Sequence, residues 1–142
     1  DEKNVDPNEV LEARLFADML PFKFQIHSVL HHSLGAVPRM KAGAFAPPAP
    51  VPALDFAGFR KAVADTRTAL EQISPDEVNH LEGKDVVFQI GDRKLPFTTE
   101  GFLLSFSLPN FYFHATTAYD ILRTKGVPLG KRDYLGRLRL KG

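Results

Sequence analysis

Histidines carry most of the metal-binding chemistry that this sequence offers. His27 and His31 are four residues apart in "FKFQIHSVLHHSLG", so they share one face of a helix. His114 lies one turn into a second helical pattern, "FYFHATTAYDILRTKG", and projects toward its apolar face. Three imidazoles plus a water suit zinc or a similar ion. The sequence therefore predicts an open divalent-metal site at these three residues if the two helices pack antiparallel.

The same histidines have a second interpretation. A histidine at the edge of an apolar helix stripe is commonly a half-buried residue held by a hydrogen bond. A helix that supplies two metal ligands usually places them at i and i+4, and the residue four after His114 is Ala118, which cannot ligate. His32 and His80 are expected on the surface. Both interpretations of His114 remain open from the sequence.

Three polar side chains are candidates for orienting a ligand through a hydrogen bond. They are Asp18, Gln25 and Tyr119. Tyr119 has an alternative role as a core ring with its hydroxyl at the rim. The sequence contains no glycine-rich phosphate loop, no Ser-His-Asp spacing and no glutamate-bearing zincin helix, so these enzyme classes are not indicated.

The amino-acid composition limits the kinds of partner and environment that the protein can have. The 18 basic and 17 acidic side chains nearly cancel, so no general field favours nucleic acid. There is no cysteine, which excludes disulfides and fits a reducing, cytoplasmic compartment. The longest apolar run, residues 101–113, contains two serines, a proline and an asparagine, so we expect no membrane span. With 142 residues and 44% hydrophobic content, residues 1–142 suit a single domain.

Helices must position the candidate residues, and the first is expected to begin at Asp6. Asp6, Pro7 and Glu9 supply an N-cap, a first-turn proline and a capping-box carboxylate. Apolar positions continue to Met19, and Pro21 then kinks or restarts the helix because it lacks a backbone donor.

Beyond Pro21 the helical pattern continues through the first histidine pair. Its apolar stripe is Phe22, Ile26, Val29, Leu30 and Val37. Gly35 and Pro38 are expected to end it. The proline-rich residues 46–54 then predict a stiff, extended connection across one end of a bundle.

Asp55 is a candidate N-cap of the next helix, which keeps a 3.6-residue apolar period until Ser74 and Pro75 close it. "SPDEV" indicates one more short turn. Residues 84–97 alternate in hydrophobicity around Gly91-Asp92 and predict a small β-hairpin. Pro96 cannot donate to a ladder, so the second strand is expected at an edge.

The last helix is expected from Thr99 to Lys125, with a disturbance at Pro109 and Gly126 as its stop. Residues 127–142 are expected to form a tail. Three helices and a hairpin leave one flank of the core open. A fourth helix, from residues upstream or from a second subunit, would complete a bundle. The chain begins without a methionine, so we expect upstream residues.

Three stretches of the sequence carry a resemblance to a known family. They are "EARLFADMLPFKFQI", "GDRKLPFTTEGFLLSFSLPNFYFH" and "LPNFYFHATTAYDILRTKGVPLGKRDYLG". In this order they strongly resemble the family called domain of unknown function 1993, which is similar to the DinB/YfiT-like metalloenzymes. The resemblance covers residues 5–136.

The resemblance implies a mainly α, DinB-like up-down four-helix bundle with a small hairpin, often dimeric, whose first helix lies upstream of Asp1. In typical DinB-like proteins a divalent metal sits between a histidine of the second helix and two histidines four apart on the last. His114 matches the first of that pair, and Ala118 replaces the second. His31 or His27 would supply the ligand of the second helix.

Two functions follow as hypotheses. The first is a divalent-metal protein, binding zinc, nickel or manganese, or a metal-dependent transferase or hydrolase acting on a small molecule, as some DinB-like relatives are. The second is a non-catalytic homodimeric helical module for stress response, or for binding a small apolar ligand or partner. Ala118 and the 12 phenylalanines favour the second.

Overall fold

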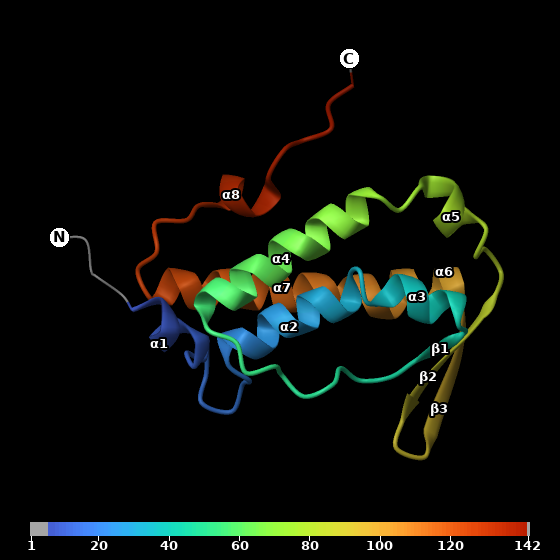
Figure 1. Cartoon of the computed structure of the whole chain (residues 1–142), viewed down its shortest axis with the longest axis horizontal. Coiled ribbons are helices and arrows are strands. Elements are labelled where there is room, and N and C mark those ends of the chain that lie inside the picture. The colour runs from blue at the N-terminus through green and yellow to red at the C-terminus, as the bar shows by residue number, and fades with distance from the viewer. Residues whose placement is uncertain (1–5, 142) are drawn as a thin grey trace.

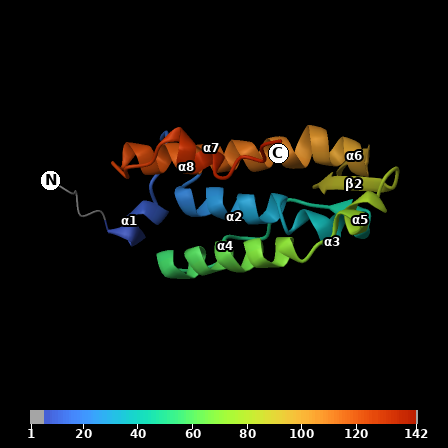
Figure 2. The ribbon, with the colours of Figure 1, turned by 90° about the horizontal axis from the view of Figure 1, so that it is seen from above.

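Three long helices form the body of the molecule, and the computed structural model describes residues 6–141. They are α2 (Phe22–His32), α4 (Phe56–Glu71) and α7 (Leu108–Thr124). Figure 2 shows α2 lying between the other two. The contact of α2 with α7 is the most extensive between any two elements, whereas α2 touches α4 less. Side chains of α2 and α7 therefore share the main helix interface.

The first helix, α1 (Pro7–Leu11), begins where the sequence indicates. The Asp6 carboxylate accepts a hydrogen bond from the Asn8 backbone N–H at 2.9 Å, and Pro7 occupies the first helical position. Both features satisfy or remove backbone donors that a helix start leaves without partners. The predicted start at Asp6 is confirmed.

The first helix is much shorter than the sequence predicts. α1 ends at Leu11, so its expected continuation to Met19 is wrong. The backbone N–H of Phe22 donates to the Ala13 carbonyl at 2.8 Å, which closes the residues between them into a loop. α2 then starts directly after Pro21, at the expected restart.

α2 ends at His32, and α3 (Ala36–Lys41) follows after a short turn. Pro38 was expected to end the helix and instead lies in the first turn of α3, where a missing backbone donor costs little. A side chain at Gly35 would place its Cβ only 2.6 Å from the His31 carbonyl, so this turn requires glycine.

Residues 46–54 contain no helix or strand and run alongside α2 (Figure 1). The Asp55 carboxylate then accepts a hydrogen bond from the Gly58 N–H at 2.7 Å and caps α4, as predicted. The extra short turn is also present, as α5 (Pro75–Asn79).

The predicted hairpin consists of β2 (Asp85–Ile90) and β3 (Arg93–Thr98), which pair antiparallel. A third strand, β1 (Ala44–Phe45), pairs parallel with β2 and was not predicted. Two residues carry too little periodicity to indicate a strand. The order β1-β2-β3 leaves β3 at an edge, so the expected position of Pro96 is confirmed.

The last helix begins as α6 (Thr99–Phe102), widens into the π-helical turn η1 (Leu103–Ser107) and continues as α7. The wide turn directly precedes Pro109, which interrupts the helical hydrogen-bond ladder as expected. Lys125 caps α7, and Gly126 has φ 85°, a conformation that favours glycine.

The expected tail contains a further short helix, α8 (Lys131–Leu135), so its description as tail alone is wrong. The Asp133 carboxylate accepts a hydrogen bond from the Gly130 N–H at 2.7 Å. The Tyr134 hydroxyl lies 3.0 Å from Thr116 Oγ1, which attaches α8 to α7. Local capping and one long-range hydrogen bond together order this turn.

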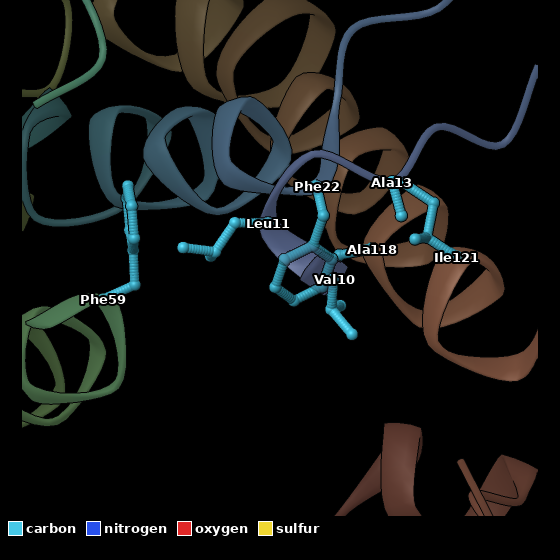
Figure 3. Packing of buried hydrophobic residues seen from close by; sticks show 7 residues of the cluster. All are labelled: Val10, Leu11, Ala13, Phe22, Phe59, Ala118 and Ile121. Carbon is cyan, nitrogen blue, oxygen red and sulfur yellow. The ribbon is translucent and has the colours of Figure 1, made fainter. Parts of the chain in front are cut away.

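Two apolar clusters form the core. The bundle cluster joins α1, α2, α4 and α7 through residues that include Phe22, Phe59 and Ile121 (Figure 3). The sheet cluster lies between α3, the sheet and the α6–η1 segment and is rich in phenylalanine rings. None of the helices that the structure describes is long and apolar enough to cross a membrane.

The sheet cluster predicts a large difference between two neighbouring substitutions. Phe102 is fully buried, whereas Leu104 is 70% exposed. Phe102→Ala should lower the free energy of unfolding by about 3–5 kcal/mol, because it removes a buried ring and leaves a cavity. Leu104→Ala should change it by less than about 0.5 kcal/mol. Urea denaturation measures both, and equal effects would contradict this packing.

Candidate functional site

The interface between α2 and α7 contains an unusual number of buried polar side chains, which we call the polar seam. They are Gln25, Ser28 and His32 on α2, and Ser107, His114 and Thr117 at η1 and α7. All but His114 are at most 8% exposed, and His114 is half-buried. The spacing of the α2 members, i, i+3 and i+7, places them on one face of the helix.

Gln25 fixes the hydrogen-bonding state of His114. Its Nε2 donates to the Leu20 carbonyl at 2.8 Å, and its Oε1 lies 2.7 Å from His114 Nδ1. A carbonyl can only accept, so the orientation of the amide is determined. Oε1 must then accept from an N–H at His114 Nδ1, which leaves the lone pair of the neutral ring on Nε2.

His114 presents an available nitrogen. Within residues 6–141 its Nε2 has no protein hydrogen-bond partner, and it is not among the fully enclosed polar atoms that lack one. Burial lowers the pKa of His114 below its usual 6.5, so the ring is neutral near pH 7. A neutral imidazole of this kind can accept a hydrogen bond or a proton, or bind a cation.

His32 is buried at 8% exposure, so its predicted surface position is wrong. Its ring stacks on His114 with centroids 6.3 Å apart and planes at 15°. Ser107 Oγ donates to the His32 carbonyl at 3.1 Å. Burial, followed by the charges of His31 and His114, lowers the pKa of His32 to about 4. The sequence signal that was missed is its i+7 spacing from Gln25.

His27 and His31 face the proline-rich connection instead of His114. Their Nε2 atoms donate to the carbonyls of Ala49, at 2.9 Å, and Ala46, at 2.8 Å. Burial is the largest cause of a lowered pKa at His31. These two hydrogen bonds hold the connection against α2, so both rings have a structural role.

The metal expectation does not fit this arrangement. The described residues contain no group of three His, Asp or Glu side chains that could hold a metal ion. The set His27, His31 and His114 therefore stays a prediction without geometric support. Of the three residues expected to orient a ligand, Gln25 contacts His114, whereas Asp18 is exposed in a loop and Tyr119 packs edge-on against Tyr134.

A second concave feature is an apolar groove between α4 and α7, floored by α2, which we call the α4–α7 groove. It consists of two cavities of about 400 and about 410 Å³ that share Phe22, Ile26 and Val63. Further lining residues include Phe56, Phe59, Phe111, Tyr112, Ala115, Ala118, Tyr119 and Leu122. Its charged lining residues are Arg60 and Asp133, so the groove is almost wholly apolar.

The comparisons with known proteins place the chain in a family. The family model described as "Domain of unknown function (DUF1993)" matches residues 1–135. The chain belongs to the DUF1993 family. The DUF1993 chain is also similar to the crystal structure of a DinB family member protein from Shewanella denitrificans, with 30% identity and a TM-score of 0.73. That match covers 99% of this chain and 79% of the other.

The fold of this DUF1993 protein is thus DinB-like, mainly helical, with a small three-stranded mixed sheet. No curated protein matches the sequence significantly. The family description assigns no activity. The polar seam and the α4–α7 groove are the two features of the structure that bear on function.

The buried imidazoles predict a pH dependence of stability. His31, His32 and His114 each have a folded-state pKa below 6.5, so the unfolded chain binds more protons in mildly acidic solution. Their contribution to stability is complete above about pH 6.5 and is lost as the pH falls below this value, in the case of His32 down to about pH 4.

Urea denaturation between pH 7.5 and pH 4 measures this contribution. His32→Asn should flatten the profile relative to wild type, because it removes the lowest pKa of the three. His80→Asn is the matched control, since it makes the same substitution at an exposed position. Parallel profiles for wild type and His32→Asn would contradict the buried neutral imidazole.

Proposed function

We propose that this DUF1993 protein binds a small molecule at His114 and accepts a hydrogen bond or a proton from it at Nε2. The single observation that carries the proposal is the hydrogen bond between His114 Nδ1 and Gln25, which presents a neutral ring with its lone pair free. At His31 the Ala46 carbonyl instead holds the Nε2 proton, so the opposite tautomer is present there.

Gln25 suits a base more than a permanent cation. An amide oxygen holds the Nδ1 proton but carries no charge, so it stabilises an imidazolium less than a carboxylate would. Burial also disfavours the charged ring. His114 therefore stays unprotonated near neutral pH and can take up a proton transiently, which is what general-base chemistry needs. The substrate group would be an acidic O–H, N–H or S–H of a small molecule.

A divalent metal would need more donors than His114 offers within the described residues. His27 and His31 donate their Nε2 protons to backbone carbonyls and face away from His114, and Ala118 supplies no ligand. The donor set therefore does not fit the metal that typical DinB-like relatives bind, and no step of the proposed chemistry passes through one.

The α4–α7 groove supports a second proposal, the binding of one amphipathic helix. Phe111, Ala115, Ala118 and Leu122 line it at helical spacing over about 16 Å, or three turns. The two alanines leave room for close approach. About a fifth of the matched DinB chain has no counterpart in this chain, which is enough for a further helix. Such a helix would complete the expected four-helix bundle.

Chemical modification tests the first proposal. Diethyl pyrocarbonate reacts with accessible, unprotonated imidazole nitrogens. His114 should therefore be modified at pH 7 faster than His27 and His31, because the Nε2 atoms of these two carry protons and only Nδ1, which is hindered by the adjacent Cβ, can react. Peptide mapping by mass spectrometry measures each rate. Phenol, benzamide and 2-mercaptoethanol, tested as O–H, N–H and S–H donors, should shift the His114 ring resonances in NMR spectra.

The matched variant is His114→Gln, which keeps a polar side chain but has no imidazole. In this variant the three donors should no longer shift the NMR signals of the other residues of the polar seam. Gln25→Leu should change the His114 tautomer and its ring nitrogen shifts without unfolding the chain. An unreactive His114, together with no response to any of the three donors, would overturn the proposal.

A dye-binding experiment tests the groove. Val63 is 42% exposed and lines the groove, whereas Leu95 is 41% exposed on the edge strand. Val63→Asp should weaken binding of 1-anilinonaphthalene-8-sulfonate at least about fivefold, because it places a charge in an apolar site, and Leu95→Asp should not. Light scattering identifies the source of the helix, since a homodimer lost only in Val63→Asp indicates a second copy. Equal dye binding in both variants would refute the groove.

A further inference from the structure

A third cavity is lined by residues of α3, the sheet and the start of the proline-rich connection, and it shares no lining residue with the α4–α7 groove. Its volume is about 630 Å³. The lining residues are Arg39, Ala44, Phe45, Ala46, Val87, Gln89, Gly91 and Lys94. The set combines two cations, one amide, four apolar side chains and a glycine, and it contains no carboxylate.

Neither cation is neutralised by a neighbour. The ion pairs among residues 6–141 are Lys23–Glu12, Lys41–Glu77, Lys61–Asp65 and Arg67–Glu71. Arg39 and Lys94 belong to none of them. Two unpaired positive side chains around one cavity produce a local positive potential, even though the whole chain is nearly neutral.

Arg39 is held in place before any ligand arrives. Its Nη1 donates to the Gly35 carbonyl at 2.6 Å, and its guanidinium lies 5.9 Å from the centre of the Phe45 ring. A Cβ at Gly35 would come within 3.0 Å of Nη1, so the glycine permits this close approach. One N–H and one face of the Arg39 guanidinium are thus anchored, and its other N–H donors are left for a ligand. Because the side chain is already ordered, less conformational entropy is lost on binding.

The hairpin supplies the opposite wall. Gln89 and Lys94 are directly paired across β2 and β3, so their side chains emerge on the same face of the sheet. Val87 lies two residues before Gln89 and shares this face, which is opposite to the buried Val86 and Phe88. An ammonium, an amide and an apolar side chain are therefore adjacent.

We propose that this cavity binds a small organic anion, a carboxylate or a phosphate monoester, through Arg39 and Lys94. The oxygens of the anion pair with the guanidinium fork and the ammonium, Gln89 contributes a polar edge, and the apolar part of the ligand lies on Val87. Arginine and lysine are the residues that proteins use most for such groups.

Isothermal titration calorimetry with phenyl phosphate, benzoate and inorganic phosphate tests the site. Phenyl phosphate should bind most tightly, because it presents both the anion and an apolar body. Arg39→Gln should weaken it about tenfold or more, and Lys94→Gln about threefold or more. Arg93→Gln is the matched control: it removes the same charge from the same hairpin but does not line the cavity, so affinity should change less than about twofold.

Circular dichroism and thermal melting establish that the three variants fold like the wild type. If none of the anions binds at about 10 mM, the site does not exist. An equal loss in Arg93→Gln would mean that only the general charge of the hairpin attracts the anion, and it would also overturn the assignment. A preference for benzoate over phenyl phosphate would identify the carboxylate as the natural group.

Discussion

The amide of Gln25 is the interaction on which the polar seam depends. One end of the amide donates to the loop before α2, at Leu20, and the other accepts from α7, at His114. A buried amide with both ends satisfied costs little, whereas one left unpaired costs about 1–3 kcal/mol. The same side chain therefore fixes the loop, the register of the two main helices and the tautomer of His114.

The ring of His32 connects the polar seam to the sheet cluster. Its ring stacks on His114 on one side and meets Phe45 and Phe106 of the sheet region on the other, with centroids 5.4 and 5.7 Å away. An imidazole is flat and apolar on its faces, so it packs among aromatic rings while it is neutral. Protonation would place a charge in this junction, and the fold prevents that by lowering the pKa of His32.

Sequence reasoning succeeded where the determining interactions are local. The caps at Asp6 and Asp55, the stop at Gly126 and the hairpin depend on residues within a few positions of one another. Prediction from sequence failed where contacts between segments distant in the chain determine the structure. β1 exists because Val87 pairs with Ala44, and the loop before α2 closes through a hydrogen bond from the Phe22 N–H to the Ala13 carbonyl. Neither partner can be identified from local pattern alone.

The candidate site was only partly predictable for a similar reason. His114 and Gln25 were identified, but α2 has three covered faces, and hydrophobic spacing does not say which element covers each. The apolar stripe turned out to floor the groove, the His27–His31 face meets the proline-rich connection, and the polar face packs on α7. Because His32 belongs to that polar face, its burial depends on the position of α7, which the sequence does not specify.

Ala118 marks the position on α7 where the polar seam ends and the bundle cluster begins. It is 5% exposed, belongs to the bundle cluster with Phe22 and Ile121, and lines the groove. A histidine at this position, as in typical DinB-like proteins, would place a polar ring among apolar side chains. One turn earlier, the His114 ring pairs with the amide of Gln25. The boundary between polar and apolar packing thus falls within a single turn of α7, and it favours an imidazole paired to Gln25 over a set of metal ligands.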